Sequence, residues 1–138
     1  MNSARRLVCL ANSRKPDGRC IAGKSLTGGE WIRPVSARLG AELTSAECRC
    51  VDGCAPALLD VIDIPLSRAD PRGHQRENYL IAAGPKWSRI GKVTWQEALA
   101  LVDDADVLWV NDFSTTDGRN DRVPPENIGS CENSLALI

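Results

Sequence analysis

The first third of the chain alternates short apolar runs with turn residues, which predicts an antiparallel β-meander. Leu7–Ala11 is an apolar run of strand length, and the Pro-Asp-Gly sequence at 16–18 combines a fixed φ, a capping side chain and a glycine that tolerates positive φ. The return strand is predicted at Arg19–Gly23 and a third strand at Trp31–Ser36. Because Pro34 cannot donate to a ladder, we expect the third strand to lie at an edge there or to be bulged.

The middle and the end of the chain predict three further strands. Residues 37–57 carry no sustained period and are interpreted as a loop. Leu58–Leu66 is β-rich and of strand length, and its alternation gives it two distinct faces. Asn78–Ala82 predicts a shorter strand, and Val107–Val110 predicts another.

One segment has the pattern of an α-helix. Thr94, followed three residues later by Glu97, matches a capping box. An apolar stripe then recurs at i, i+3, i+4 and i+7: Trp95, Ala98, Leu99 and Val102. The sequence therefore predicts a helix over about 94–103, which should end near Asp103 because acidic residues at a helix C-terminus oppose the macrodipole.

Together these elements favour a mainly β domain of the β-rich α+β type, in which a small OB-like barrel carries one inserted α-helix. A mixed α+β sheet is the alternative. We expect residues 1–130 to form the domain. Leu135–Ile138 is apolar again with nothing polar after it, so we expect either that this strand closes the barrel or that the chain is cut from something longer.

Length and composition place the chain among globular proteins of one domain or two very small ones. It has 138 residues, 43% of them hydrophobic and 25% charged, which is enough apolar surface for a packed core. Its longest apolar runs are far shorter than the ~18–20 residues of a membrane span, and the run after Arg5-Arg6 is too short for a signal peptide. We therefore expect a cytoplasmic protein without membrane contact, whose six cysteines are reduced thiols.

The net charge of −1 conceals two halves of opposite sign. Residues 1–40 hold eight Lys and Arg against two Asp and Glu, a net of +6, whereas residues 41–138 hold nine against sixteen, a net of −7. Such asymmetry often marks a binding surface. The alternative is that the opposite charges pair with each other within the fold.

Three cysteines lie close together in the chain, Cys48, Cys50 and Cys54. Thiolates bind zinc well, but structural zinc sites use four ligands and usually paired C-x2-4-C spacing. A fourth ligand would have to come from elsewhere: Cys131, Cys20 or His74. We therefore expect loop or core cysteines here, and we predict neither a metal nor a cofactor.

The only histidine, His74, lies in a polar turn close to Glu77. A histidine beside a carboxylate can act as a general base, with the carboxylate fixing its tautomer. However, the chain has no G-x-S-x-G nucleophile motif and no phosphate-binding glycine loop. We therefore interpret His74, with Gln75 and Asn78, as loop-ordering or ligand-contacting residues and not as catalytic ones.

The third predicted strand carries the residues that most favour nucleic-acid binding. Side chains alternate along a strand, so Trp31 and Arg33 share one face. An aromatic ring and a guanidinium offer a platform for a base and a cation for phosphate, as single-stranded nucleic acids require. Further basic residues lie at or near turns that adjoin this strand: Arg14, Lys15, Arg19 and Lys24. The alternative is that Trp31 belongs to the core and Arg33 is an edge charge that prevents aggregation.

Several ordered segments together resemble one family over most of the chain. They are Val8–Lys15, Gly18–Gly23, Gly29–Ser36, Leu58–Val61, His74–Ile81, Leu108-Trp109, Asn120–Val123 and Ser134–Ile138. In this order they resemble bacterial dual-OB-domain proteins, and because the motifs are long and ordered, chance does not explain the match.

This resemblance implies two OB-like barrels in tandem that bind nucleic acid and have no assigned catalytic residue. It also implies that 131–138 is the first strand of a second OB-like domain, most of which this chain lacks. A binding site between the two barrels would then be incomplete. The cysteines at 48, 50 and 54 are not part of the family pattern, which lowers the case for zinc further.

From these observations we predict a non-catalytic module that binds single-stranded RNA or DNA. Its predicted contact residues are Arg14, Lys15, Arg19, Lys24, Trp31, Arg33, His74, Gln75 and Asn78. One alternative is an enzyme of nucleic-acid or nucleotide chemistry, with His74, Glu77 and Asp63 in its pocket. Another is an adaptor that binds a protein partner through strand edges and through Trp87 or Trp109.

Overall fold

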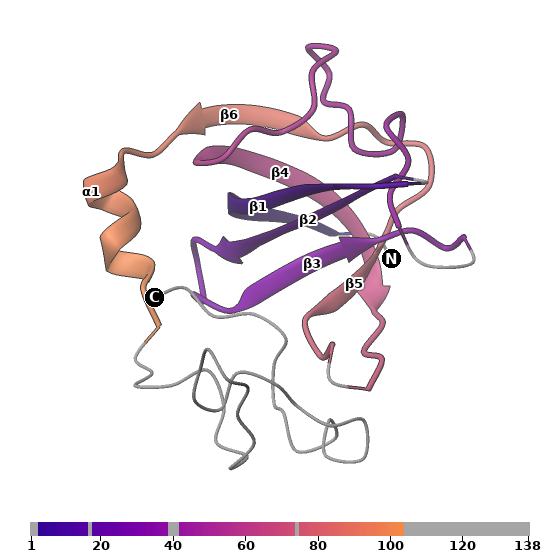
Figure 1. Ribbon diagram of the computed structural model, residues 1–138, viewed down its shortest axis with the longest axis horizontal. Helices are drawn as coiled ribbons and strands as arrows, with labels where there is room; N and C mark the ends of the chain where they lie inside the picture. Colours follow the sequence, from indigo (N-terminus) through magenta and orange to yellow (C-terminus); the bar gives the residue numbers. More distant parts are fainter. Residues whose placement is uncertain (1–2, 17, 39–41, 74, 104–138) are drawn as a thin grey trace, which may run out of the picture.

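The computed structural model describes residues 3–16, 18–38, 42–73 and 75–103. The predicted strand at Val107–Val110, the segment 131–138, His74 and Trp109 lie outside these ranges. Within them the strands are β1 (Ser3–Lys15), β2 (Gly18–Ser25), β3 (Trp31–Val35), β4 (Asp60–Ala69), β5 (Asn78–Ile81) and β6 (Ser88–Lys92). A short helix α1 (Trp95–Ala98) and a 3₁₀ turn η1 (Leu99–Leu101) follow β6 (Figure 1).

Five of these strands close into a barrel. The strand order is β1-β2-β3-β5-β4, and β1 pairs with β4 to complete the circle. β6 pairs with Asp60–Asp63 at the start of β4. The β3–β5 pair is parallel and the other pairs are antiparallel. This order, with its single parallel pair, is that of an OB-like barrel. The predicted fold class is therefore confirmed.

Closure of the barrel depends on a bend in β1. Residues Ser3–Val8 pair with β4 and residues Leu7–Lys15 pair with β2, with a register shift between Cys9 and Ala11. A bulge of this kind bends a strand and increases its twist. Gly23 lies opposite the bend, where a Cβ atom would be 2.0 Å from the carbonyl oxygen of Val8. The two strands can approach this closely only because residue 23 has no side chain.

The core is filled from the strands, from the long connection between β3 and β4, and by Trp87 just before β6. In β4 the predicted alternation is confirmed, because Ile62, Ile64 and Leu66 are buried and the residues between them are half-buried. The core cluster consists of Leu7, Cys9, Ile21, Ile32, Leu43, Cys48, Cys50, Ile62, Ile64, Leu66 and Trp87. Trp87 is thus a core residue. The adaptor hypothesis requires it at the surface, where a partner could contact it.

Pro34 lies in the part of β3 that no longer pairs with β2. The β2–β3 pairing covers only Trp31 and Ile32, whereas β3 continues to pair with β5 through Arg33, Pro34 and Val35. Beyond Ile32, β3 is therefore an edge on its β2 side, as the missing N–H of Pro34 predicts.

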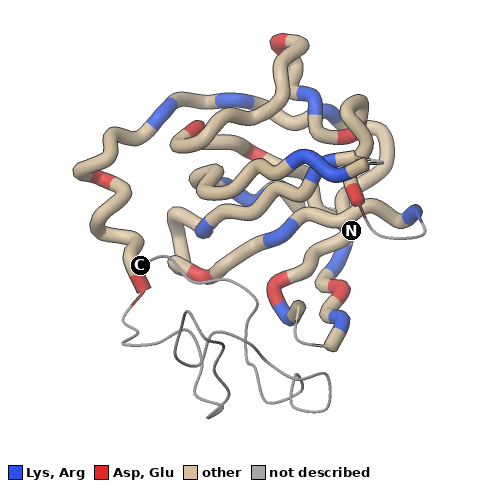
Figure 2. Tube along the Cα trace, in the orientation of Figure 1, with Lys and Arg blue, Asp and Glu red and all other residues tan. Residues whose placement is uncertain are grey.

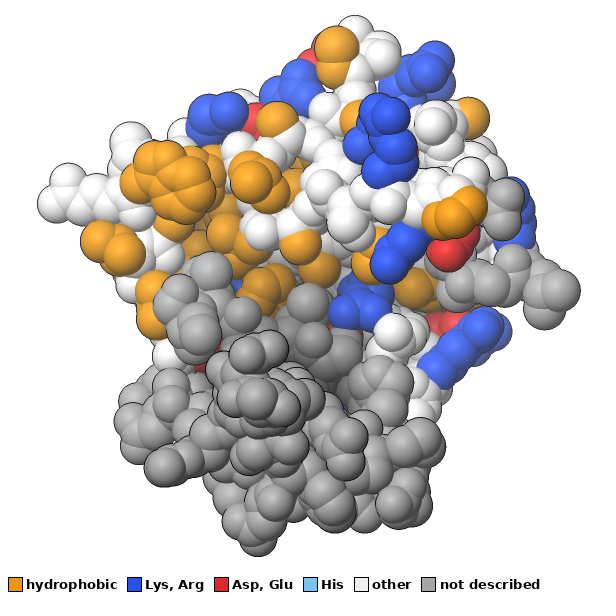
Figure 3. All heavy atoms as spheres, viewed as in Figure 1, with side chains coloured by type: hydrophobic (Ala, Val, Ile, Leu, Met, Phe, Trp, Pro, Cys, Tyr) orange, Lys and Arg blue, Asp and Glu red, His pale blue; other side chains and the backbone are white. Residues whose placement is uncertain are grey.

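The helix differs from its prediction in length and in environment. The capping box of Thr94 and Glu97 is present, but α1 ends at Ala98 and continues only as η1, and it follows the barrel strands instead of being inserted among them. Of the apolar stripe only Ala98 is buried, while Trp95 and Leu99 are 71% and 69% exposed. The strands and the β3–β4 connection already fill the barrel, so the stripe contributes nothing to the core cluster. Hydrophobic side chains are accordingly visible at this end of the molecule (Figure 3).

Candidate nucleic-acid interface

The tip of the β1–β2 hairpin concentrates positive charge. Arg14 lies directly opposite Arg19 across the antiparallel ladder, and Lys15 lies opposite Gly18. Like charges that face each other across a strand pair destabilise it. A hairpin that keeps two guanidinium groups in this register is therefore suited to bind an anion between or beside them.

Two hollows adjoin this hairpin and share Lys15 and Arg19. The first, of about 340 Å³, is lined by Arg14, Lys15, Pro16, Gly18, Arg19, Thr44 and Ser45. The second, of about 190 Å³, is lined by Lys15, Arg19, Cys20, Arg33, Pro34, Val35, Glu42 and Gln75. We call these two hollows and their lining residues the hairpin surface. It unites five of the predicted contact residues: Arg14, Lys15, Arg19, Arg33 and Gln75.

The hairpin surface is held in place by the β3–β4 connection. The backbone N–H of Arg19 donates to the carbonyl of Leu43 at 2.7 Å, and the N–H of Leu43 donates back at 3.1 Å. A Cβ at Gly18 would lie 2.2 Å from the same carbonyl oxygen, so only glycine permits this contact. The guanidinium of Arg19 also donates to the Oδ1 of Asn12 at 3.1 Å. The basic side chains therefore start from a fixed backbone.

Ion pairing separates the basic residues of the N-terminal region into two groups. Five of the eight pair with carboxylates: Arg5 with Glu30, Arg6 with Asp63, Lys24 with Asp103, Arg33 with Glu77, and Arg38 with Glu47. Within the described ranges, Arg14, Lys15 and Arg19 have no carboxylate partner. Lys and Arg positions are visible at this end of β1 and β2 in Figure 2. Pairing within the fold is therefore confirmed for five of these residues, and the binding surface stays a prediction for the other three.

Arg33 lines the hairpin surface and also forms a buried ion pair. Its guanidinium lies 3.1 Å from a carboxylate oxygen of Glu77, and the Glu77 side chain is 1% exposed. The backbone N–H of Arg33 donates to the carbonyl of Glu77 at 2.9 Å. Asp63, the other carboxylate of the enzyme hypothesis, instead pairs with Arg6 on β1 at 2.9 Å. Glu77 and Asp63 thus pair with different arginines, and the enzyme hypothesis stays a prediction.

Gln75 and Asn78 have different positions. Gln75 lines the second hollow, and its Oε1 accepts from the Nδ2 of Asn78 at 3.2 Å. Asn78 is fully buried beside Arg33 in the β3–β5 pair. Asn78 therefore orients Gln75 and is not itself exposed to a ligand.

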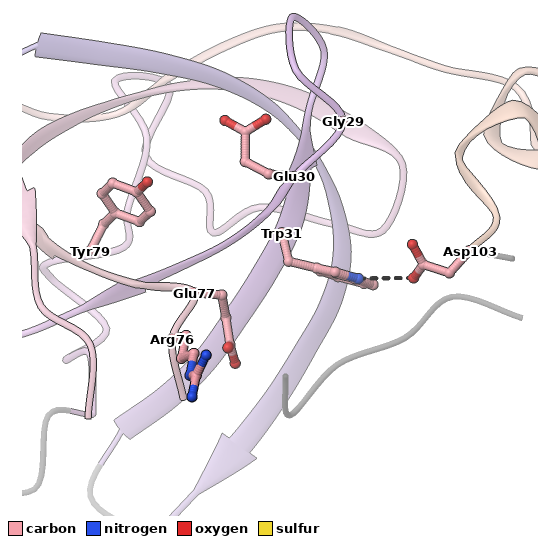
Figure 4. A pocket seen from close by; sticks show the side chains of 7 residues that line it. All are labelled: Gly29, Glu30, Trp31, Arg76, Glu77, Tyr79 and Asp103. Atoms are coloured by element: carbon pink, nitrogen blue, oxygen red, sulfur yellow. Dashed lines mark hydrogen bonds between the residues drawn. The ribbon is translucent and has the colours of Figure 1, made fainter. Parts of the chain in front are cut away.

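Trp31 and Lys24 lie apart from the hairpin surface. Trp31 lines a third hollow of about 340 Å³, together with Gly29, Glu30, Arg76, Glu77, Tyr79 and Asp103 (Figure 4). Its indole Nε1 donates to a carboxylate oxygen of Asp103 at 3.0 Å, and the buried Lys24 ammonium pairs with the same carboxylate. Trp31 and Arg33 therefore do not form one shared platform, although alternation along β3 places both on its outer side.

Thr44 and Ser45 belong to the hairpin surface but were not predicted as contact residues. The Oγ1 of Thr44 accepts from the backbone N–H of Glu47 at 3.0 Å, and a carboxylate oxygen of Glu47 accepts from the N–H of Thr44 at 2.8 Å. This is a capping box, and its Thr-x-x-Glu spacing is a sequence signal for a turn. The sequence does not reveal that this turn lies against the hairpin.

The cysteines of the predicted cluster are separated by burial. Cys48 and Cys50 lie in the core, whereas Cys54 is exposed. Burial raises the pKa of the Cys48 and Cys50 thiols, and it raises the pKa of Cys9 to about 11. The described residues contain no group of three side chains placed to hold a metal ion.

Comparison with known proteins gives one match. Neither a search of curated proteins nor a search of solved structures returned a similar chain. No helix in the described ranges is long and apolar enough to cross a membrane. The model of one family, described as a dual OB-containing domain, matches residues 5–138, in agreement with the closed barrel. The chain therefore belongs to the dual OB-containing domain family.

Proposed function

We propose that this protein is a non-catalytic module that binds single-stranded nucleic acid through the hairpin surface. The observation that carries the proposal is the hairpin tip, where Arg14, Lys15 and Arg19 gather without carboxylate partners in the described residues, over two hollows. Barrels of the OB type bind single strands through a basic groove and loops at one side. The family assignment supports the same class of ligand.

The lining of the hairpin surface favours contacts to the phosphate backbone. Among the described residues, the two hollows are lined mainly by basic, hydroxyl and amide side chains, with Glu42 as their one carboxylate and without an aromatic ring. Base stacking on aromatic side chains therefore contributes little at this surface, and charge contributes most. Binding of this kind depends weakly on sequence and strongly on salt.

A fluorescence anisotropy titration tests the proposal. A labelled single strand of about 12 nucleotides, as RNA or DNA, and the matching duplex are titrated at several salt concentrations from about 50 mM upward. We expect the single strand to bind more tightly than the duplex. The double variant Arg14→Ala/Arg19→Ala should weaken binding and reduce the slope of log K against log salt by about 1.4, because each phosphate contact on a single strand contributes about 0.7.

A matched control removes the same charge elsewhere. Arg6 and Lys92 are more than half exposed, pair with Asp63 and Asp60 on β4, and line neither hollow of the hairpin surface. The variant Arg6→Ala/Lys92→Ala should keep most of the affinity. The proposal fails if wild-type protein does not bind at low salt, if binding is insensitive to salt, or if both double variants lose affinity equally.

A further inference from the structure

A second cationic site lies at the other end of the β2–β3 pair and is occupied by the protein's own carboxylate. Lys24 and Trp31 are register partners on β2 and β3. The Lys24 ammonium donates to the carbonyl of Leu101 at 2.6 Å and pairs with Asp103, and it lies 5.5 Å from the centre of the Trp31 ring. The Trp31 indole donates to the other oxygen of Asp103 at 3.0 Å (Figure 4).

These donors form an anion site that is built into the barrel. The Lys24 residue is only 4% exposed, and its ammonium and the indole N–H of Trp31 converge on the two oxygens of one carboxylate. An ammonium is a point charge that binds phosphate oxygens as readily as carboxylates. A phosphate group of a nucleic acid therefore satisfies the same two donors.

The segment that supplies Asp103 buries little surface of its own. It consists of one α-helical turn and one 3₁₀ turn, and Ala98 is its only buried residue. The Asp103 side chain is 30% exposed. Among the described residues, displacement of this segment breaks chiefly the contacts of Asp103 with Lys24 and Trp31 and that of Leu101 with Lys24.

The hollow beside Trp31 is large enough for a nucleotide, and the carboxylates that line it are paired with basic side chains. It has a volume of about 340 Å³ and contains Tyr79 and Arg76 in addition to Trp31. The carboxylates of Glu30 and Glu77, which also line it, are paired with Arg5 and Arg33. Displacement of Asp103 from Lys24 would therefore make this hollow cationic.

We propose that Lys24 and Trp31 form a second phosphate-binding subsite, and that Asp103 competes with nucleic acid for it. This inference rests on the proposed function, because it assigns a second contact to the same ligand. Asp103 then limits affinity and confines the ligand to the hairpin surface until the segment 99–103 is displaced.

Isosteric substitutions test the competition. The variant Asp103→Asn should bind the single-stranded oligonucleotide at least about fivefold more tightly than wild type, the low end of typical coupling between sites, with a salt slope larger by about 0.7. Glu97→Gln is the matched control, because it changes the same charge in the same segment, keeps the capping box and does not contact Lys24. Its affinity should equal that of wild type.

A double variant tests whether the gain in oligonucleotide affinity depends on Lys24. In the Asp103→Asn background, Lys24→Gln should remove the gain in affinity, because that gain depends on the Lys24 ammonium. Unchanged or weaker binding by Asp103→Asn, with hairpin-dependent binding intact, overturns the competition alone. Absence of binding in wild type and in every variant overturns the proposed function.

A measurement on the wild-type protein covers the case in which Asp103→Asn does not fold. The indole N–H resonance of Trp31, assigned by comparison with Trp31→Phe, is followed by NMR during the oligonucleotide titration at low salt. We expect it to shift as the ligand replaces Asp103. A resonance that stays fixed while the hairpin resonances saturate overturns the competition.

Discussion

At the scale of single residues, burial and pairing separate side chains that are chemically alike. Arg14 and Arg33 are both arginines of the first meander, but Glu77 neutralises Arg33, while Arg14 faces Arg19. The sequence predicts that both are candidate contact residues for nucleic acid, because it shows their residue type and their spacing along the strands. It cannot predict which of them is paired, because Glu77 lies just before β5, more than forty residues from Arg33.

The cysteines allow a direct test of burial. Desolvation raises the pKa of Cys9 to about 11, so its reactive thiolate is scarce at pH 8, whereas Cys54 is exposed. In the folded protein, iodoacetamide at pH 8 should modify Cys54 and spare Cys9, as measured by mass spectrometry of the digested protein. Modification of both at the same rate would contradict the buried position of Cys9.

The Arg33–Glu77 pair should be essential for stability. Removal of one partner of a buried ion pair leaves an uncompensated charge and costs about 3–5 kcal/mol. We expect Glu77→Ala to lower the free energy of unfolding by about this amount, measured by urea denaturation. The double variant Arg33→Met/Glu77→Leu should be clearly less destabilised. If Glu77→Ala unfolds at the wild-type urea concentration, the pair is not structural.

At the scale of elements, local patterns predict the strands better than the helix. Alternation and turn residues identify all five barrel strands, because each pattern is short and local. β6 was not predicted, since its only large apolar residue, Ile90, is half exposed at an edge. The helix is shorter than its stripe because a stripe shows which residues are apolar, and not whether the barrel leaves room to bury them.

Two glycines in strands differ in how closely a neighbouring strand approaches them. A Cβ at position 23 would lie 2.0 Å from the Val8 carbonyl oxygen, whereas a Cβ at Gly91 in β6 meets nothing within 4 Å. We expect Gly23→Ala to lower the free energy of unfolding by at least about 1–3 kcal/mol, the usual cost of overpacking. Gly91→Ala should change it by less than about 1 kcal/mol. Thermal and urea unfolding of both variants measure the difference, and equal effects would contradict the described bend of β1.

At the scale of the whole molecule, the barrel sorts the predicted contact residues into two sites. The sequence predicts that Trp31 and Arg33 act together, because alternation puts them on one face of β3. Closure of the barrel instead places Arg33 beside the β1–β2 hairpin and Trp31 beside Asp103. The partners that decide this, Gln75 and Asp103, are distant in the sequence, so only the fold reveals them.

The charge asymmetry of the sequence has the same explanation. Five of the eight basic residues of the N-terminal region pair with carboxylates, four of them from beyond residue 40, and the remaining three gather at the hairpin tip. A protein with a net charge of −1 can therefore present one small cationic surface. Its contact with a polyanion should be local and sensitive to salt.

Mapping of the bound oligonucleotide by NMR is the most direct test of this account. Backbone amide resonances are followed while a single strand is added at low salt, first to wild type and then to Arg14→Ala/Arg19→Ala. The account predicts that the earliest and largest shifts occur at the amides of 12–15, 18–19, 33, 35 and 43–45, and that they are lost in the variant. Shifts confined to β6 and α1, or equal shifts in the variant, would contradict it.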